Sequence, residues 1–162
     1  MARIFHQTFD PEMAESPTAF DSAAAFKRAA FKAEELLEFL AASAKNKSDF
    51  VKLVEDLHTA IDQAKEKILR KEQSSRDPLV EQVDALADLL YFTYGSFALM
   101  NVDPNPIMEI VHQANMAKLF PDGKPHYHPQ TKKVLKPENW QRDFAPEIKI
   151  KKELLRQENS KN

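Results

Sequence analysis

Apolar residues recur at the spacing of an amphipathic helix in long, separate blocks of this chain. Capping residues stand where such blocks begin: Asp21 or Ser22 opens the first block, and Asp77 followed by Pro78 opens the third. The first block is filled with alanine, leucine, lysine and glutamate, which are good helix formers. We therefore predict four main helices, over these residues: about 21–44, from 46–48 to the polar run 71–76, about 77–100 and about 106–119.

Glycine is scarce, with two glycines against ten prolines in 162 residues. All-β folds usually need more turn glycine, so this scarcity favours long helices. Pro11 and Pro17 predict an irregular arm over residues 1–20. A proline-rich basic loop is expected to about residue 146, followed by a short charged helix over about 147–157. The predicted fold class is all-α.

Composition limits the classes of protein to which the chain can belong. Its length suits one domain, predicted to span residues 1–162. A net charge of −2, from 23 basic and 25 acidic residues, gives no broad electrostatic reason to bind duplex nucleic acid. No stretch approaches the roughly 20 apolar residues of a membrane span, so we expect a cytoplasmic protein. The absence of cysteine excludes disulfides, zinc–thiolate sites and cysteine nucleophiles.

Acidic residues cluster on the first and third predicted helices. Residues three and four apart share a helical face, so Glu38 neighbours both Glu34 and Glu35. The third helix carries a stripe of the same kind, formed by Glu81, Asp84 and Asp88. Like charges at this spacing repel by a few tenths of a kcal/mol, and uncompensated carboxylates are costly to bury. A divalent cation resolves both problems, and Mg²⁺ prefers oxygen ligands and bridges carboxylates to substrate phosphates.

Other interpretations of these acids stay open. The commonest account of an acidic run is a solvated helix face, and Asp88 suits a bond to a neighbouring helix equally well. A ferritin-like di-iron protein is a second alternative, because such bundles use Glu on two helices and Glu-x-x-His on two others. The chain formally offers that set in Glu38, Glu81, Glu55-x-x-His58 and Glu109-x-x-His112. A non-catalytic helical interaction protein using residues 145–156 is a third.

Cationic and aromatic residues for a phosphate-bearing ligand follow downstream. Asn115 and Lys118 lie three apart on the fourth predicted helix, and a lysine acts as a flexible point charge for phosphate. Lys136 lies in the basic loop with Trp140, which suits stacking on a base or, more commonly, filling a core.

The acidic pattern resembles a known signature. Glu34-Glu35-x-x-Glu38 followed by Glu81-x-x-Asp84 is similar to the E-E-x-x-E…E-x-x-D motif of the all-α NTP pyrophosphatase superfamily, which includes MazG, helical dUTPases and phosphoribosyl-ATP pyrophosphohydrolases. The runs 84–95, 112–118 and 136–140 resemble the MazG-like branch related to phosphoribosyl-ATP pyrophosphohydrolase. The resemblance covers about residues 20–142.

This resemblance implies an activity and roles for the residues named above. The chain would hydrolyse a nucleoside triphosphate, with dUTP or a related deoxynucleotide favoured, to the monophosphate and pyrophosphate. Mg²⁺, or Mn²⁺ in its place, would be held by these four acids: Glu35, Glu38, Glu81 and Asp84. Glu34 would orient or deprotonate the attacking water, or share a metal. The expected nucleotide contacts are Asn115, Lys118, Asp88, Lys136 and Trp140. The family is typically dimeric, so a homodimer is expected.

Overall fold

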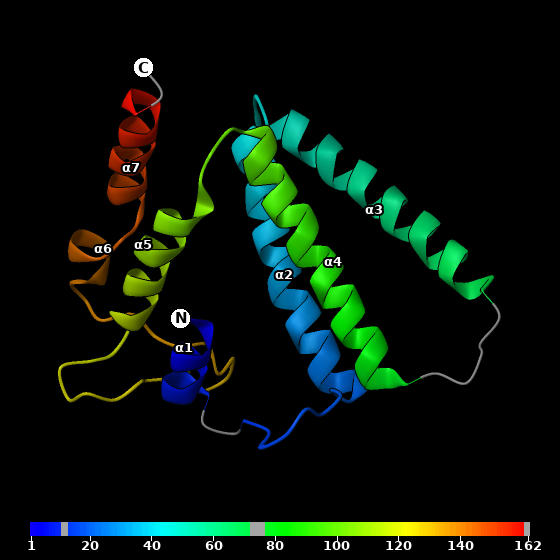
Figure 1. The fold of residues 1–162 in the computed structure, drawn as a ribbon, viewed down its shortest axis with the longest axis horizontal. Coiled ribbons are helices and arrows are strands. Elements are labelled where there is room, and N and C mark those ends of the chain that lie inside the picture. The colour runs from blue at the N-terminus through cyan, green and yellow to red at the C-terminus, as the bar shows by residue number, and fades with distance from the viewer. Residues whose placement is uncertain (11–12, 72–76, 161–162) are drawn as a thin grey trace. The chain divides into compact units, whose positions relative to one another are not determined.

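The computed structural model describes residues 1–10, 13–71 and 77–160, and these ranges contain seven helices (Figure 1). Apart from one isolated bridge between Tyr127 and Val134, they contain no β-structure. The predicted all-α class is confirmed. The helices are α1 (Ala2–Phe9), α2 (Ser22–Ser43), α3 (Lys47–Leu69), α4 (Pro78–Leu99), α5 (Pro104–Met116), α6 (Trp140–Asp143) and α7 (Glu147–Asn159).

Side-chain caps fix the starts of the long helices. Asp21 accepts a hydrogen bond from the N–H of Ala24 at 2.7 Å, and Asn46 accepts one from Asp49 at 3.0 Å. The fourth predicted helix begins earlier than expected, because Asp103 caps it through the N–H of Asn105 and proline occupies its first turn. The polar run expected to end α3 lies outside the described residues at 72–76.

Two segments predicted to be irregular are helical. The arm over residues 1–20 contains α1, because both Pro11 and Pro17 follow that helix in the sequence. The rings of Phe5 and Phe9 stack on one face of α1 at 4.5 Å, and Phe9 is buried. The basic loop contains the single turn α6, which starts where the N–H of Trp140 donates to the carbonyl of Pro137.

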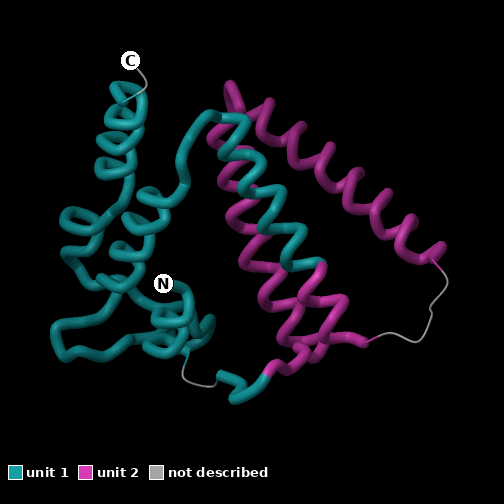
Figure 2. The backbone as a smooth tube through the Cα atoms, in the orientation of Figure 1, with its two compact units in different colours: residues 1–16, 85–162 teal, residues 17–84 magenta. Residues whose placement is uncertain are grey.

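The chain forms two compact units, one of residues 1–16 and 85–162 and the other of residues 17–84 (Figure 2). The unit of residues 1–16 and 85–162 holds a small core in which α5 contacts both α1 and α7. Its buried apolar side chains are Phe9, Ile107, Ala114 and Trp140. That the whole chain is one domain stays a prediction.

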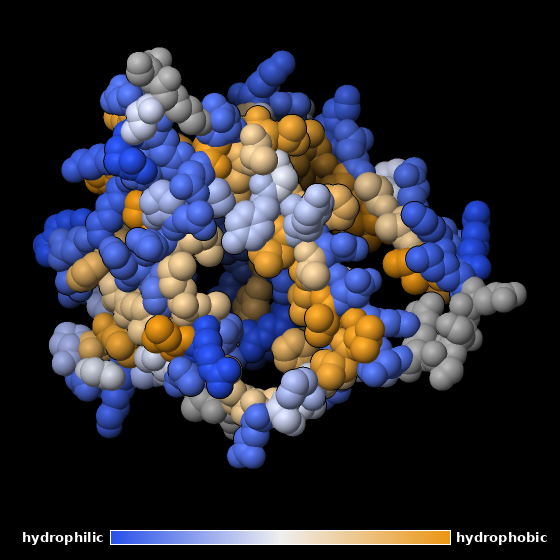
Figure 3. Space-filling view, in the orientation of Figure 1, coloured by the Kyte–Doolittle hydropathy of each residue, from blue (hydrophilic) through white to orange (hydrophobic). Residues whose placement is uncertain are grey.

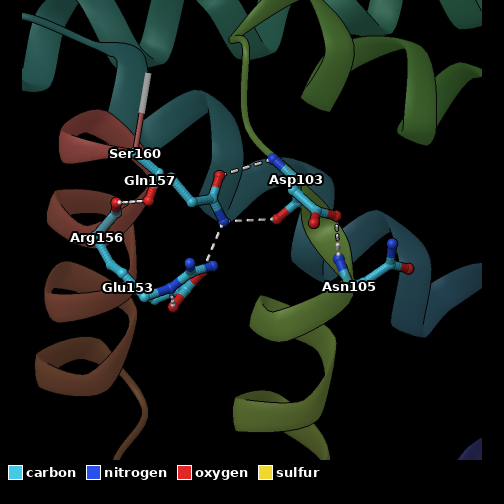
Figure 4. A network of polar contacts seen from close by, with 6 residues as sticks. All are labelled: Asp103, Asn105, Glu153, Arg156, Gln157 and Ser160. Atoms are coloured by element: carbon cyan, nitrogen blue, oxygen red, sulfur yellow. Dashed lines mark hydrogen bonds and ion pairs between the residues drawn. The ribbon is translucent and has the colours of Figure 1, made fainter. Parts of the chain in front are cut away.

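A glutamine joins α7 to the start of α5 within this unit (Figure 4). The Gln157 side chain accepts from the N–H of Asp103 at 2.8 Å and donates to its carbonyl at 3.0 Å. It also donates to Glu153, which is paired with Arg156 through two hydrogen bonds of 2.7 Å. Gln157 is 8% exposed, so these bonds satisfy a buried amide.

The unit of residues 17–84 consists of the α2–α3 hairpin and the first turns of α4. None of its described residues is buried. Large apolar side chains stay exposed on all three of its helices, including Phe26, Phe39, Ile61 and Val80. Figure 3 shows hydrophobic side chains gathered on the surface over α4. No helix within the described ranges is long and apolar enough to cross a membrane.

Candidate active site

The acids of the first motif lie in the second half of α2. Glu34, Glu35 and Glu38 are exposed, and the helix that carries them is regular from its Asp21 cap to Ser43. Glu35 and Glu38 are separated by one turn, so both carboxylates can approach one ligand from the same face.

The acids of the second motif lie in the first turns of α4. Asp77 accepts hydrogen bonds from the N–H groups of Leu79 and Val80 at 3.0 and 3.4 Å, as a helix cap does. Glu81 and Asp84 follow and are exposed.

A glutamine between these two acids fixes where they lie. Gln82 accepts a hydrogen bond from the N–H of Phe20 at 2.8 Å and donates one to its carbonyl at 2.9 Å. Phe20 directly precedes the cap of α2. The first turns of α4 are therefore held at the N-terminal end of α2. This role of Gln82 could not be predicted from the sequence, because nothing in its spacing distinguishes it from a surface residue.

The two pairs of acids do not meet within one chain. Glu35 and Glu38 lie about 21 and 26 Å along α2 from Asp21 at 1.5 Å per residue, whereas Glu81 and Asp84 flank Gln82 at the other end of α2. Throughout the described part of the chain, no three histidine, aspartate or glutamate side chains are gathered as a metal would require. Each pair has the hard oxygen chemistry that suits Mg²⁺.

The predicted phosphate-binding pair is assembled in the other unit. Lys118 donates from Nζ to the side-chain oxygen of Asn115 at 2.6 Å, and both residues are half-buried. Lys118 lies just beyond the C-terminal end of α5. The amide thus holds the ammonium group in one position near the end of the helix. Asp88, also in this unit, is exposed on α4.

Trp140 is part of the core of its unit. Its side chain is 5% exposed, and its ring N–H donates to the carbonyl of Ala114 at 2.8 Å. Lys136 lies over the ring with its Nζ 4.0 Å from the centroid, a cation–π contact. Little ring surface is left on which a nucleotide base could stack.

The alternative di-iron set is not gathered either. Glu55 and His58 are exposed on α3, while Glu109 and His112 lie on α5 in the other unit. Among the described residues, these four side chains belong to no cluster of three candidate metal ligands, and the same is true of the acids of α2 and α4.

Comparison with protein families separates these alternatives. The family model for phosphoribosyl-ATP pyrophosphohydrolase matches residues 2–115. This is more than half of the chain and includes every acid of both motifs. The chain belongs to the phosphoribosyl-ATP pyrophosphohydrolase family.

A solved structure supports the same assignment. The crystal structure of a "putative NTP pyrophosphohydrolase" from Exiguobacterium sp. 255-15 is 41% identical in sequence and superposes with a TM-score of 0.88, covering 99% of this chain and 95% of that one. No curated protein matches the chain.

Membership of the phosphoribosyl-ATP pyrophosphohydrolase family makes the chain a hydrolase that acts on pyrophosphate bonds of nucleotides. The resemblance inferred from the two acidic motifs is confirmed. Members of this family of enzymes commonly use divalent metals.

Proposed function

We propose that this phosphoribosyl-ATP pyrophosphohydrolase-like enzyme hydrolyses a nucleoside triphosphate to the monophosphate and pyrophosphate, and that dUTP or a related deoxynucleotide is its substrate. The observation that carries the proposal is the family match over residues 2–115, since it spans both acidic motifs. The solved relative described as an NTP pyrophosphohydrolase supports the triphosphate as substrate class.

The proposed metal is Mg²⁺, which Mn²⁺ can replace, held by Glu35, Glu38, Glu81 and Asp84. When bound, the metal would neutralise phosphate charge and lower the pKa of a water molecule. Glu34 precedes the first ligand directly and is the proposed general base. Its task is to accept a proton from the attacking water, which requires only hydrogen-bond reach.

Lys118 is the proposed contact to the phosphates, because Asn115 already holds its ammonium group in place at 2.6 Å. A cation held before binding loses less side-chain entropy when the anion arrives. Asp88 and Lys136 are proposed as further contacts to the nucleotide, since both are exposed. For Trp140 the burial favours an indirect role, in which the core places Lys136.

The proposed assembly is a homodimer. The support comes from the unit of residues 17–84, in which no described residue is buried and Phe26 and Val80 are 75% and 63% exposed. Helices with this much uncovered apolar surface gain stability when a partner removes it from water, by about 25 cal/mol per Å².

The test is a turnover screen of the purified protein against a panel of nucleotides with Mg²⁺ or Mn²⁺, with the products identified by phosphorus NMR. We expect pyrophosphate and a monophosphate, and turnover that stops when EDTA removes the metal. Release of orthophosphate would contradict the reaction class, and a stronger response to a ribonucleotide than to dUTP would contradict the substrate.

A further inference from the structure

We infer that α7 (Glu147–Asn159) is an interaction surface for a second copy of the chain, and that the two α7 helices pair in antiparallel orientation. The inference does not rest on the proposed function. The helix α7 lies beyond residues 2–115, which match the family model, and it carries none of the proposed site residues. It is also separate from the surface of residues 17–84 that supports the proposed homodimer.

One face of α7 is already covered by α5, with which α7 packs inside its unit. Gln157 lies on this face, is 8% exposed and bonds to both backbone groups of Asp103 (Figure 4). Glu153, one turn earlier on the same face, accepts a further hydrogen bond from Gln157. A partner of α7 therefore contacts another face of the helix.

The adjoining face of α7 is an open, mostly apolar groove. Leu154 and Leu155 form its middle and are 40% and 51% exposed. Neighbouring apolar side chains that stay exposed on one helix face gain stability when a partner removes them from water. Charged residues lie at the two ends of the groove. Its complete lining is Glu147, Ile150, Lys151, Leu154, Leu155 and Glu158.

The order of residues along this groove has the symmetry that antiparallel self-pairing requires. Lys151 lies three residues before Leu154, and Glu158 lies three residues after Leu155. A two-fold rotation about the midpoint between the two leucines brings the leucines of both copies together. The same rotation places Lys151 of each copy opposite Glu158 of the other. The contact therefore consists of four central leucines with one ion pair on either side.

Charge complementarity selects both the partner and the orientation. A parallel pair of α7 helices would place Lys151 against Lys151 and Glu158 against Glu158, and facing like charges destabilise a helix pair. The antiparallel pair replaces both repulsions with attractions. A second copy of the chain carries the matching order of charges, and a two-fold contact of this kind joins two chains and then closes.

The first test traps the register with disulfides, which is clean because the chain has no cysteine. Lys151→Cys and Glu158→Cys chains are mixed and mildly oxidised, and one ion pair stays intact in the mixed pair. We expect a covalent dimer of one chain of each kind. Either variant alone should give much less, since its two thiols are seven residues apart along the helices, about 10 Å. The control mixes Glu158→Cys with Lys149→Cys, whose side chain lies on the opposite side of α7. A yield from the first mixture no higher than from the control, or from Lys151→Cys alone, would overturn the inference.

The second test reverses the charges and measures association by sedimentation velocity. Lys151→Glu alone and Glu158→Lys alone should each associate about tenfold more weakly than the wild type, because both ion pairs become repulsions. A mixture of the two variants should regain wild-type association, since each charge again faces its opposite. Lys149→Glu makes the same charge change away from the groove and should associate like the wild type. A change from four chains to two, or from two to one, in the single variants supports the inference. Single variants that match Lys149→Glu, or a mixture no stronger than its components, would overturn it.

Discussion

Gln82 pairs with both the N–H and the carbonyl of Phe20, at 2.8 and 2.9 Å, and so fixes the start of one acidic helix to the start of the other. In the other unit, Gln157 forms the same pair of hydrogen bonds with the N–H and the carbonyl of Asp103. In both cases a side-chain amide supplies the hydrogen-bond partners that the backbone of a residue at the start of a helix would otherwise lack.

Replacing Gln82 by alanine should weaken the protein and its metal binding together. Two hydrogen bonds at a half-exposed position are expected to cost about 1–2 kcal/mol in the free energy of unfolding. Because Glu81 and Asp84 flank Gln82, the affinity for Mn²⁺ should also fall. Urea unfolding and Mn²⁺ titration measure the two effects. The control is Gln63→Ala on α3, a glutamine remote in sequence from both motifs, which should change neither quantity. Equal Mn²⁺ affinity in the Gln82 variant and the wild type would show that the hydrogen bonds between Gln82 and Phe20 have no part in metal binding.

Acid should loosen the attachment of α7. Hydrogen bonds from Arg156, and then from Gln157, lower the pKa of Glu153 from 4.5 to about 2. A carboxyl group whose pKa is lower in the folded state contributes stability above its unfolded pKa and loses that contribution as the pH falls toward the folded pKa. The stability of the wild type should therefore decline between about pH 4.5 and 2 more steeply than that of Glu153→Gln, as measured by urea unfolding at a series of pH values. Parallel curves for the two proteins would argue against this pairing.

The substitution Trp140→Phe tests whether Trp140 fills the core or stacks on a nucleotide base. The substitution removes the bond to the carbonyl of Ala114 and leaves a gap in the core, so we expect a loss of about 2–3 kcal/mol in unfolding free energy. The KM for the nucleotide should stay within about twofold of the wild-type value, because the buried ring leaves little surface on which a base could stack. A twofold change corresponds to about 0.4 kcal/mol in binding. Thermal unfolding and steady-state kinetics measure the two. A large rise in KM without loss of stability would instead place the indole against the base.

Lys118→Met should raise the KM for the nucleotide by about tenfold, as expected when one charge-assisted hydrogen bond of about 1.5 kcal/mol is lost. Methionine keeps the unbranched apolar stem of the side chain and removes the charge together with the hydrogen bond to Asn115. The control is Lys124→Met, an exposed lysine of the basic loop, for which no change is expected. If both variants behave alike, the positive charge near the end of α5 acts only at long range, and Asn115 has no role in placing it.

Local signals in the sequence predicted most of the helices. Asp21 caps α2 as expected, because a capping residue acts within its own turn. The helix α1 was missed because the prolines that predicted an irregular arm follow it in the chain. A proline breaks a helix only where it falls, not upstream.

The identity of the acids of the candidate site could be predicted from the sequence, but their arrangement in space could not. Helical periodicity tells which side chains share a face, so the pairing of Glu35 with Glu38 could be inferred from the sequence. It does not tell where the face points. That depends on the bonds between Gln82 and Phe20, which join residues 62 positions apart and leave no local pattern. The burial of Trp140 could not be predicted for the same reason, because its ring N–H bonds to the carbonyl of Ala114, which is distant in the sequence.

Titration of Mn²⁺ into the wild type and three alanine variants, followed by EPR, tests most directly whether the acids of α2 and α4 hold the metal. Two variants replace a proposed ligand, Glu38→Ala on α2 and Asp84→Ala on α4, and the third, Glu55→Ala on α3, replaces an exposed acid that only the di-iron alternative would use. We predict that the tight sites of the wild type disappear in the first two variants and persist in the third. Unchanged binding in Glu38→Ala and Asp84→Ala, or its loss in Glu55→Ala, would contradict the account.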